Sequence, residues 1–161
     1  MKTKDKTAPP RRKRSLLKGF LAGAVGGLAG AATKALAEAV YPPRTQGQIP
    51  PPAVLVNRMA GRSLTEQEEE TSVRVIHWGF GALVGGVYGA LAEYAPIVTG
   101  RVGVNFGLTL CGITHASALP MMGLTEKPED QPPREHASEL VTHAIYGVTT
   151  EVVRRVTRKM L

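Results

Sequence analysis

Long runs of small and apolar residues alternate with shorter polar segments along the chain. Three runs, at residues 16–40, 73–94 and 97–119, are each close to the ~20 residues that a helix needs to cross a bilayer. A fourth run, at residues 136–153, is more polar, and it can span only if its polar face is turned inward. The pattern therefore predicts an all-α protein, a four-helix transmembrane bundle.

The polar segments divide the chain around this domain. Residues 41–72 and 120–135 are rich in proline and charge, so we expect them to be loops. We expect a disordered basic tail at residues 1–15, a four-helix membrane domain at residues 16–155 and a second basic tail at residues 156–161.

The basic residues are distributed unevenly. Of the twenty, eight lie in the first eighteen positions and four near the chain end, and Arg101 occupies the short predicted hairpin between the second and third runs. Cytoplasmic segments of membrane proteins are enriched in Lys and Arg. The distribution predicts that both termini and the hairpin are cytoplasmic and that the two long loops are outside.

Small residues recur at helical spacing in the first three runs. Aromatic residues make up only 5% of the chain, whereas there are 18 glycines, so large side chains cannot fill the core. In membranes, small residues four positions apart allow helix backbones to approach closely. We therefore expect small-xxx-small packing through three stripes: Gly23, Gly27 and Gly30; Gly81, Gly85 and Gly89; Gly103, Gly107 and Cys111.

Each stripe leads to ionisable residues near the predicted outer face. At 1.5 Å per residue these residues lie roughly 3–9 Å below the outer boundary, so alternating topology brings them into one layer. The candidate intramembrane polar cluster is Lys34, Glu38, His77, His115, Glu139 and His143. Two further acids, Glu93 and Glu151, form a separate candidate pair on the cytoplasmic side, near Arg101, Arg154 and Arg155.

Two interpretations of the polar cluster stay open. Intramembrane ionisable groups are functional candidates, and histidine changes charge near neutral pH, which favours a pH-responsive module or one that handles a small solute or ion. The alternative is structural: the polar groups join helices, and the glycine stripes bind a second copy or another membrane protein. The partners that we expect are accordingly the lipid bilayer and either a homo-oligomer or a membrane-protein partner.

Other classes of function find little support. The sequence contains no nucleophile motif, phosphate loop or HxxxH spacing, so we predict no enzyme activity, no cofactor and no metal. The basic tails lack zinc spacing and aromatic platforms, so we predict no nucleic-acid partner. Ala35-Leu36-Ala37 resembles a signal-peptide cleavage site, but Lys34 precedes it within an unusually long apolar run. A soluble or peripheral Gly/Ala-rich helical protein is a further alternative.

Several short motifs together resemble a known family. They are Leu119-Pro120-Met121-Met122-Gly123-Leu124-Thr125, then Ser138-Glu139 with His143, then Glu151 with Arg154-Arg155. Lys34, Glu38 and Pro42-Pro43-Arg44 agree in the first helix and its exit, and His77 and Glu93 fall at matching places. Over roughly residues 16–158 the chain resembles the YagU family of bacterial inner-membrane proteins of unknown function. The resemblance implies a multi-pass protein of the bacterial inner membrane, but no reaction.

Overall fold

The computed structural model describes residues 13–45 and 47–161, and these form helices and connecting segments without any strand. Most of the predicted disordered tail, residues 1–12, lies outside the described residues. In chain order the elements are α1 (Leu16–Val40), α2 (Pro51–Ala60), α3 (Glu66–Ala92), the 3-10 segment η1 (Pro96–Gly103), α4 (Val104–Ile113), the π-helical segment η2 (Thr114–Ala118), α5 (Leu119–Met121), the 3-10 turn η3 (Pro128–Asp130) and α6 (Pro133–Met160).

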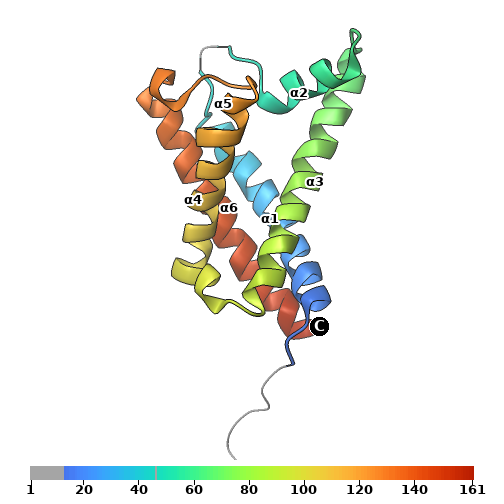
Figure 1. The fold of residues 1–161 in the computed structure, drawn as a ribbon, viewed down its shortest axis with the longest axis vertical. Coiled ribbons are helices and arrows are strands. Elements are labelled where there is room, and N and C mark those ends of the chain that lie inside the picture. Colours follow the sequence, from blue (N-terminus) through green and yellow to red (C-terminus); the bar gives the residue numbers. More distant parts are fainter. Residues whose placement is uncertain (1–12, 46) are drawn as a thin grey trace, which may run out of the picture.

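The long helices α1 and α6 cross between α3 and α4, which flank them in Figure 1. Helix α1 packs against both α3 and α6, and α4 packs against α6. The start of α1, the segment η1 and the end of α6 lie together at the lower end of Figure 1, which we call the terminal end. Helices α2 and α5 lie at the opposite end, which we call the loop end. The predicted grouping of the termini with the hairpin therefore corresponds to one end of the bundle.

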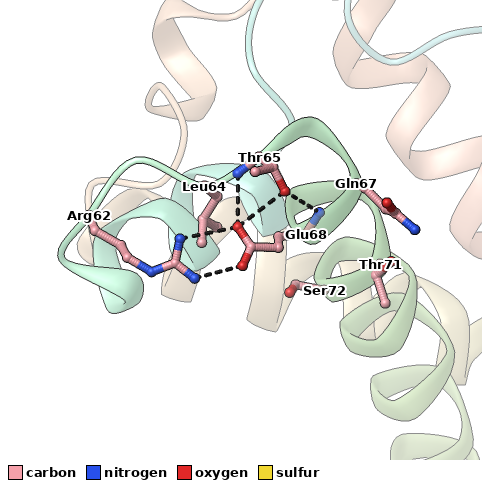
Figure 2. Close-up of a pocket in the computed structure, with 7 residues that line it drawn as sticks. All are labelled: Arg62, Leu64, Thr65, Gln67, Glu68, Thr71 and Ser72. Carbon is pink, nitrogen blue, oxygen red and sulfur yellow. Dashed lines mark hydrogen bonds and ion pairs between the residues drawn. The ribbon is translucent and has the colours of Figure 1, made fainter.

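Two helices are longer than the apolar runs suggest. Helix α3 begins at Glu66 rather than at residue 73, because Thr65 and Glu68 form a capping box and three acids occupy the first turn (Figure 2). Helix α6 continues to Met160, so most of the predicted tail at residues 156–161 is helical. Arg158 in this last turn is buried and pairs with Glu93, which explains why the helix persists.

The third apolar run differs most from its predicted helix. Residues Pro96–Gly103 form a 3-10 segment in which Arg101 and Val102 have positive φ, and α4 begins only at Val104. At the other end, Thr114–Ala118 adopt π-helical geometry just before Pro120. Proline lacks the N–H for a helical hydrogen bond and crowds the carbonyl four residues earlier, so the widened turn accommodates it. The helix then continues through Pro120 to Met121.

Polar and apolar residues are arranged in the opposite way to those of a water-soluble bundle. Buried apolar side chains are few, whereas Glu139, His143, Thr150 and Glu151 on α6 are all buried. Large apolar residues of α1, α3 and α6 face outward, among them Leu21, Leu28, Phe80, Leu83, Leu91, Val152 and Val156. Within the described residues, three helical segments are long and apolar enough to cross a membrane: Leu16–Val40, Glu66–Ala92 and Pro96–Met121. Together these features indicate a membrane protein.

Glycines lie where the helix axes approach most closely. A Cβ atom placed on Gly23 of α1 would lie 2.1 Å from the carbonyl oxygen of Gly85 on α3. A Cβ atom placed on Gly107 of α4 would lie 2.0 Å from the carbonyl oxygen of His143 on α6. At both contacts a larger residue would force the backbones apart, so the present crossings depend on glycine.

Candidate functional site

The buried carboxylate of Glu139 on α6 gathers charged groups from three other segments at the loop end. Its Oε1 lies 3.3 Å from Arg44 Nη2 and 3.3 Å from His115 Nε2, and its Oε2 lies 3.9 Å from Lys34 Nζ. Only 5% of the Glu139 side chain is exposed, so these groups are its main polar neighbours among the described residues. We call Lys34, Glu38, Arg44, His115, Glu139 and His143 the Glu139 cluster.

The basic members of the cluster come from α1 and from the segment that follows it. Lys34 forms an ion pair with Glu38 one turn later, and both side chains are largely buried. Arg44 follows Pro42-Pro43, where proline prevents continuation of α1 and the chain passes the start of α6. Ser138 donates a hydrogen bond to the carbonyl of Tyr41, which holds this exit segment against α6.

The two histidines of the cluster face each other between η2 and α6. Their ring centroids are 4.8 Å apart in an edge-to-face arrangement. His143 Nδ1 lies 2.8 Å from the carbonyl oxygen of Glu139, which can only accept, so Nδ1 carries a proton. The hydroxyl of Thr114 donates to the carbonyl of Leu110 at 2.7 Å and accepts from His115 Nδ1 at 3.0 Å. In its neutral form each of the two imidazoles therefore keeps an unprotonated Nε2.

One candidate residue lies apart from the others. His77 on α3 is 3.4 Å from the carbonyl oxygen of Ala31 and stacks edge-to-face on Trp78. Because α3 packs on a different face of α1 from α6, His77 faces α1 rather than Glu139. Two residues that the candidate set lacked lie at the site instead. Arg44 belongs to the Pro42-Pro43-Arg44 exit, and Cys111 ends the third small-residue stripe.

Cys111, His115 and His143 lie close enough to share one ligand. The Cys111 sulfur and one ring nitrogen from each histidine all lie within 4.8 Å of one another. Cys111 and His115 are four residues apart across the junction of α4 and η2, and His143 comes from α6. The sequence lacks a compact metal motif because these ligands come from two segments that only the fold brings together.

A cavity of about 380 Å³ lies above the cluster at the loop end. Arg44 and Glu139 line it, so the cavity meets the cluster at the carboxylate of Glu139. Its other charged lining groups are Glu126 and Glu135, which makes the lining acidic overall. Glu135 accepts hydrogen bonds from the backbone N–H of Thr45 at 2.7 Å and from the side chain of Gln48, so it also fixes the loop above α6.

A second hollow, of about 420 Å³, surrounds the start of α3 (Figure 2). Its charged groups already satisfy each other: Arg62 pairs with Glu68 at 2.7 Å, and Glu68 also accepts from the backbone N–H of Thr65. The hydrogen bond to Glu68 raises the pKa of Arg62. This arrangement caps the helix, and we assign no ligand to it.

The Leu119–Thr125 motif forms a helix end. Gly123 has a φ of 64°, and its N–H donates to the carbonyl of Pro120. The N–H of Leu124 donates to the carbonyl of Leu119, as in other glycine-terminated helices. Arg58 of α2 donates to the carbonyls of Met122 and Gly123, at 2.7 and 3.1 Å. The motif thereby anchors α2 and places Leu124 in the cavity wall.

Of the two acids at the terminal end, Glu151 is held by the arginines that the sequence suggests, whereas Glu93 is held by a different one. Glu151 accepts from Arg154 and Arg155, and also from the hydroxyl of Tyr88 at 2.7 Å. Glu93 pairs with Arg158 at 2.6 Å rather than with Arg101, and it accepts from the backbone N–H of Ser15. The hydrogen bonds from Arg158 hold the pKa of Glu93 below its ordinary value. Both acids therefore join helices at this end.

Helices with apolar outer faces around a buried charged cluster define a helical membrane protein with three candidate spans. Residues 28–152 match the sequence model of the DUF1440 family, described as proteins of unknown function, and the chain belongs to this family. The comparisons with curated proteins and with solved structures gave no match.

Proposed function

We propose that this chain is a multi-pass protein of the bacterial inner membrane that binds a small cation from the outer side through the Glu139 cluster. The observation that carries the proposal is the position of Glu139. Its carboxylate is buried among two basic and two imidazole side chains, and it also lines the acidic cavity at the loop end. A cation entering that cavity meets more carboxylates than basic groups, which favours positive over negative solutes.

The proposal includes α6 as a fourth membrane span. Its mean hydropathy is low because its charged and polar residues form one face, and that face is buried against α1 and α4. The outer face carries Leu140, Val141, Val152 and Val156, which suit contact with lipid. A polar stripe turned inward is how charged residues are tolerated within a membrane.

We place the terminal end in the cytoplasm, because α1 begins and α6 ends there, and the sequence around both points is rich in Lys and Arg. Membrane-impermeant maleimide labelling of intact cells tests this placement. Ser63→Cys at the loop end should be labelled from outside, whereas Ile97→Cys at the terminal end should be labelled only after lysis. The native Cys111 is buried, and a Cys111→Ser background removes any residual signal. Labelling of Ile97→Cys in intact cells would show that the terminal end lies outside, which contradicts the proposed orientation.

Thermal unfolding of the full chain in mild detergent tests cation binding. A bound ligand at 100 times its Kd stabilises a protein by about 2.7 kcal/mol. We expect at least one cation from a panel of alkali, alkaline-earth and transition-metal ions and small amines to raise the Tm of the wild type. Glu139→Gln should remove that increase, and Glu68→Gln, in the other hollow, should keep it. The proposal fails if no cation stabilises the wild type, or if Glu139→Gln responds equally.

The assembly alternative, in which the glycine stripes bind another protein, receives less support. Gly23 and Gly27 of α1 face Gly85 and Gly81 of α3, and Gly107 of α4 faces α6. The stripes make contacts within one chain, which gives less support to their binding a second copy or a partner.

A further inference from the structure

We propose that Cys111, His115 and His143 bind a single thiophilic transition-metal ion, Zn²⁺ or Cu⁺, next to Glu139. The inference rests on the proposed cation-binding function and names the ion class. One thiol sulfur and two imidazole nitrogens lie within 4.8 Å of one another across α4, η2 and α6. Thiolate with imidazole is a donor set that suits these ions, whereas alkali and alkaline-earth ions prefer oxygen.

The hydrogen bonds of the two histidines already match those of metal ligands. A metal-bound imidazole commonly donates its other ring N–H to a carbonyl or another acceptor, which fixes the tautomer and the ring orientation. His143 Nδ1 donates to the carbonyl of Glu139 at 2.8 Å, and His115 Nδ1 donates to the hydroxyl of Thr114 at 3.0 Å. In both rings the lone pair that remains for a metal is on Nε2.

The surroundings of Glu139 supply a second, independent observation. Its Oε1 lies 3.3 Å from His115 Nε2, the ring nitrogen that is left for a ligand when His115 is neutral. Its Oε2 is buried and, within the described part of the chain, has no hydrogen-bond partner. Arg44 and Lys34 lie 3.3 Å from Oε1 and 3.9 Å from Oε2, so the carboxylate already has positive neighbours on the side of α1. A metal ion on His115 Nε2 would add a positive neighbour on the side of η2.

The three donor atoms need to move only slightly closer together to bind one metal ion. Bond lengths of about 2.0–2.3 Å to nitrogen and sulfur place tetrahedral ligand atoms about 3.5 Å apart. Rotation of the Cys111 and His115 side chains would draw the three donors together to that separation, with Glu139 as a fourth ligand or as counter-charge. A monovalent ion bound to thiolate leaves the net charge of the site unchanged. A divalent ion adds one positive charge, which Glu139 can balance.

The test uses the full chain in mild detergent, stripped of metal with a chelator and kept reduced. Co²⁺ replaces Zn²⁺ as a spectroscopic probe, and we expect a near-ultraviolet sulfur-to-metal charge-transfer band that saturates at one ion per chain. Competition with chromophoric chelators then gives separate affinities for Zn²⁺ and Cu⁺. Cys111→Ser and His143→Gln should lower the affinity by at least about 100-fold, since loss of a ligand's hydrogen-bond partner alone costs 10–100-fold. His77→Gln, the matched control outside the cluster, should bind as the wild type does.

The wild-type spectrum keeps the test decisive even where a variant fails to fold. Absence of the charge-transfer band, or equal affinities for the wild type and a folded Cys111→Ser variant, would overturn the metal site. If Na⁺ or an amine still stabilises the wild type in a Glu139-dependent way, the cation-binding function stands without this site. If no cation binds at all, both proposals are wrong.

Discussion

The hydroxyl of Tyr88 on α3 donates to the Oε2 of Glu151 on α6 at 2.7 Å, and the Glu151 side chain has no exposed surface. The same carboxylate accepts two hydrogen bonds from Arg154. One buried acid thus joins α3 to α6 and neutralises an arginine that is itself buried at the terminal end of the bundle.

Replacing Glu151 with glutamine should destabilise the protein strongly. Removing one partner of a buried ion pair leaves the other charge uncompensated, at a cost of about 3–5 kcal/mol. Equilibrium unfolding in mixed detergent micelles measures the loss. Tyr88→Phe removes one hydrogen bond and keeps the ion pairs, so it should cost only about 1–3 kcal/mol. Equal effects of the two substitutions would contradict this account.

Gly85→Ala should separate α1 from α3. The added Cβ would lie 2.5 Å from the carbonyl oxygen of Gly23 and 2.6 Å from the Cα of Gly27, and neither backbone atom can move alone. We expect a loss of about 1–3 kcal/mol, as for other overpacked interiors. Gly79→Ala is the matched control on the same helix, because nothing lies within 4 Å of its added Cβ. Helix propensity alone favours alanine over glycine, so a loss in stability that is as large for Gly79→Ala would contradict the packing explanation.

Stability at the terminal end should fall in acid through Glu93. Hydrogen bonds from Arg158 and from the backbone N–H of Ser15 lower the pKa of Glu93 from its ordinary value of 4.5. Its stabilising contribution is therefore complete above pH 4.5 and disappears as the pH falls through the lower folded-state value. The stability difference between the wild type and Glu93→Gln, measured against pH, should be constant near neutrality and shrink below pH 4.5. A difference that grows in acid would contradict the assignment.

Thr114→Val tests the orientation of His115 rather than its ligation. The hydroxyl of Thr114 accepts from His115 Nδ1, so its loss should free the ring and weaken Zn²⁺ binding by about 10–100-fold. The control is Thr99→Val, since Thr99 bonds the carbonyl of Pro96 in η1, at the other end of the bundle. Unchanged affinity in Thr114→Val would mean that packing alone positions His115.

The depth of the candidate residues could be predicted from the sequence, because position along a helix converts directly into height in the bundle. Lys34 and Glu38 near the end of α1 and Glu139 and His143 near the start of α6 must lie at one level once the helices alternate in direction. The apolar runs likewise predict the three candidate spans, since length and hydropathy are properties of each segment alone. The start of α3 was not predicted, because the acids after Thr65 were assigned to a loop, whereas Thr65 and Glu68 cap the helix there.

Only the tertiary structure decided which residues meet, because a helix can rotate about its axis without changing the depth of its side chains. Packing turns His77 toward Ala31, and it turns Cys111 toward His115 and His143. Arg44 reaches Glu139 because the two prolines before it redirect the chain across α6. The sequence by itself determined a helical protein with three segments long and apolar enough to cross a membrane and with ionisable residues at one level. Glycines lie at the contacts of α1 with α3 and of α4 with α6, and the rotation of each helix in these contacts decides which groups surround Glu139.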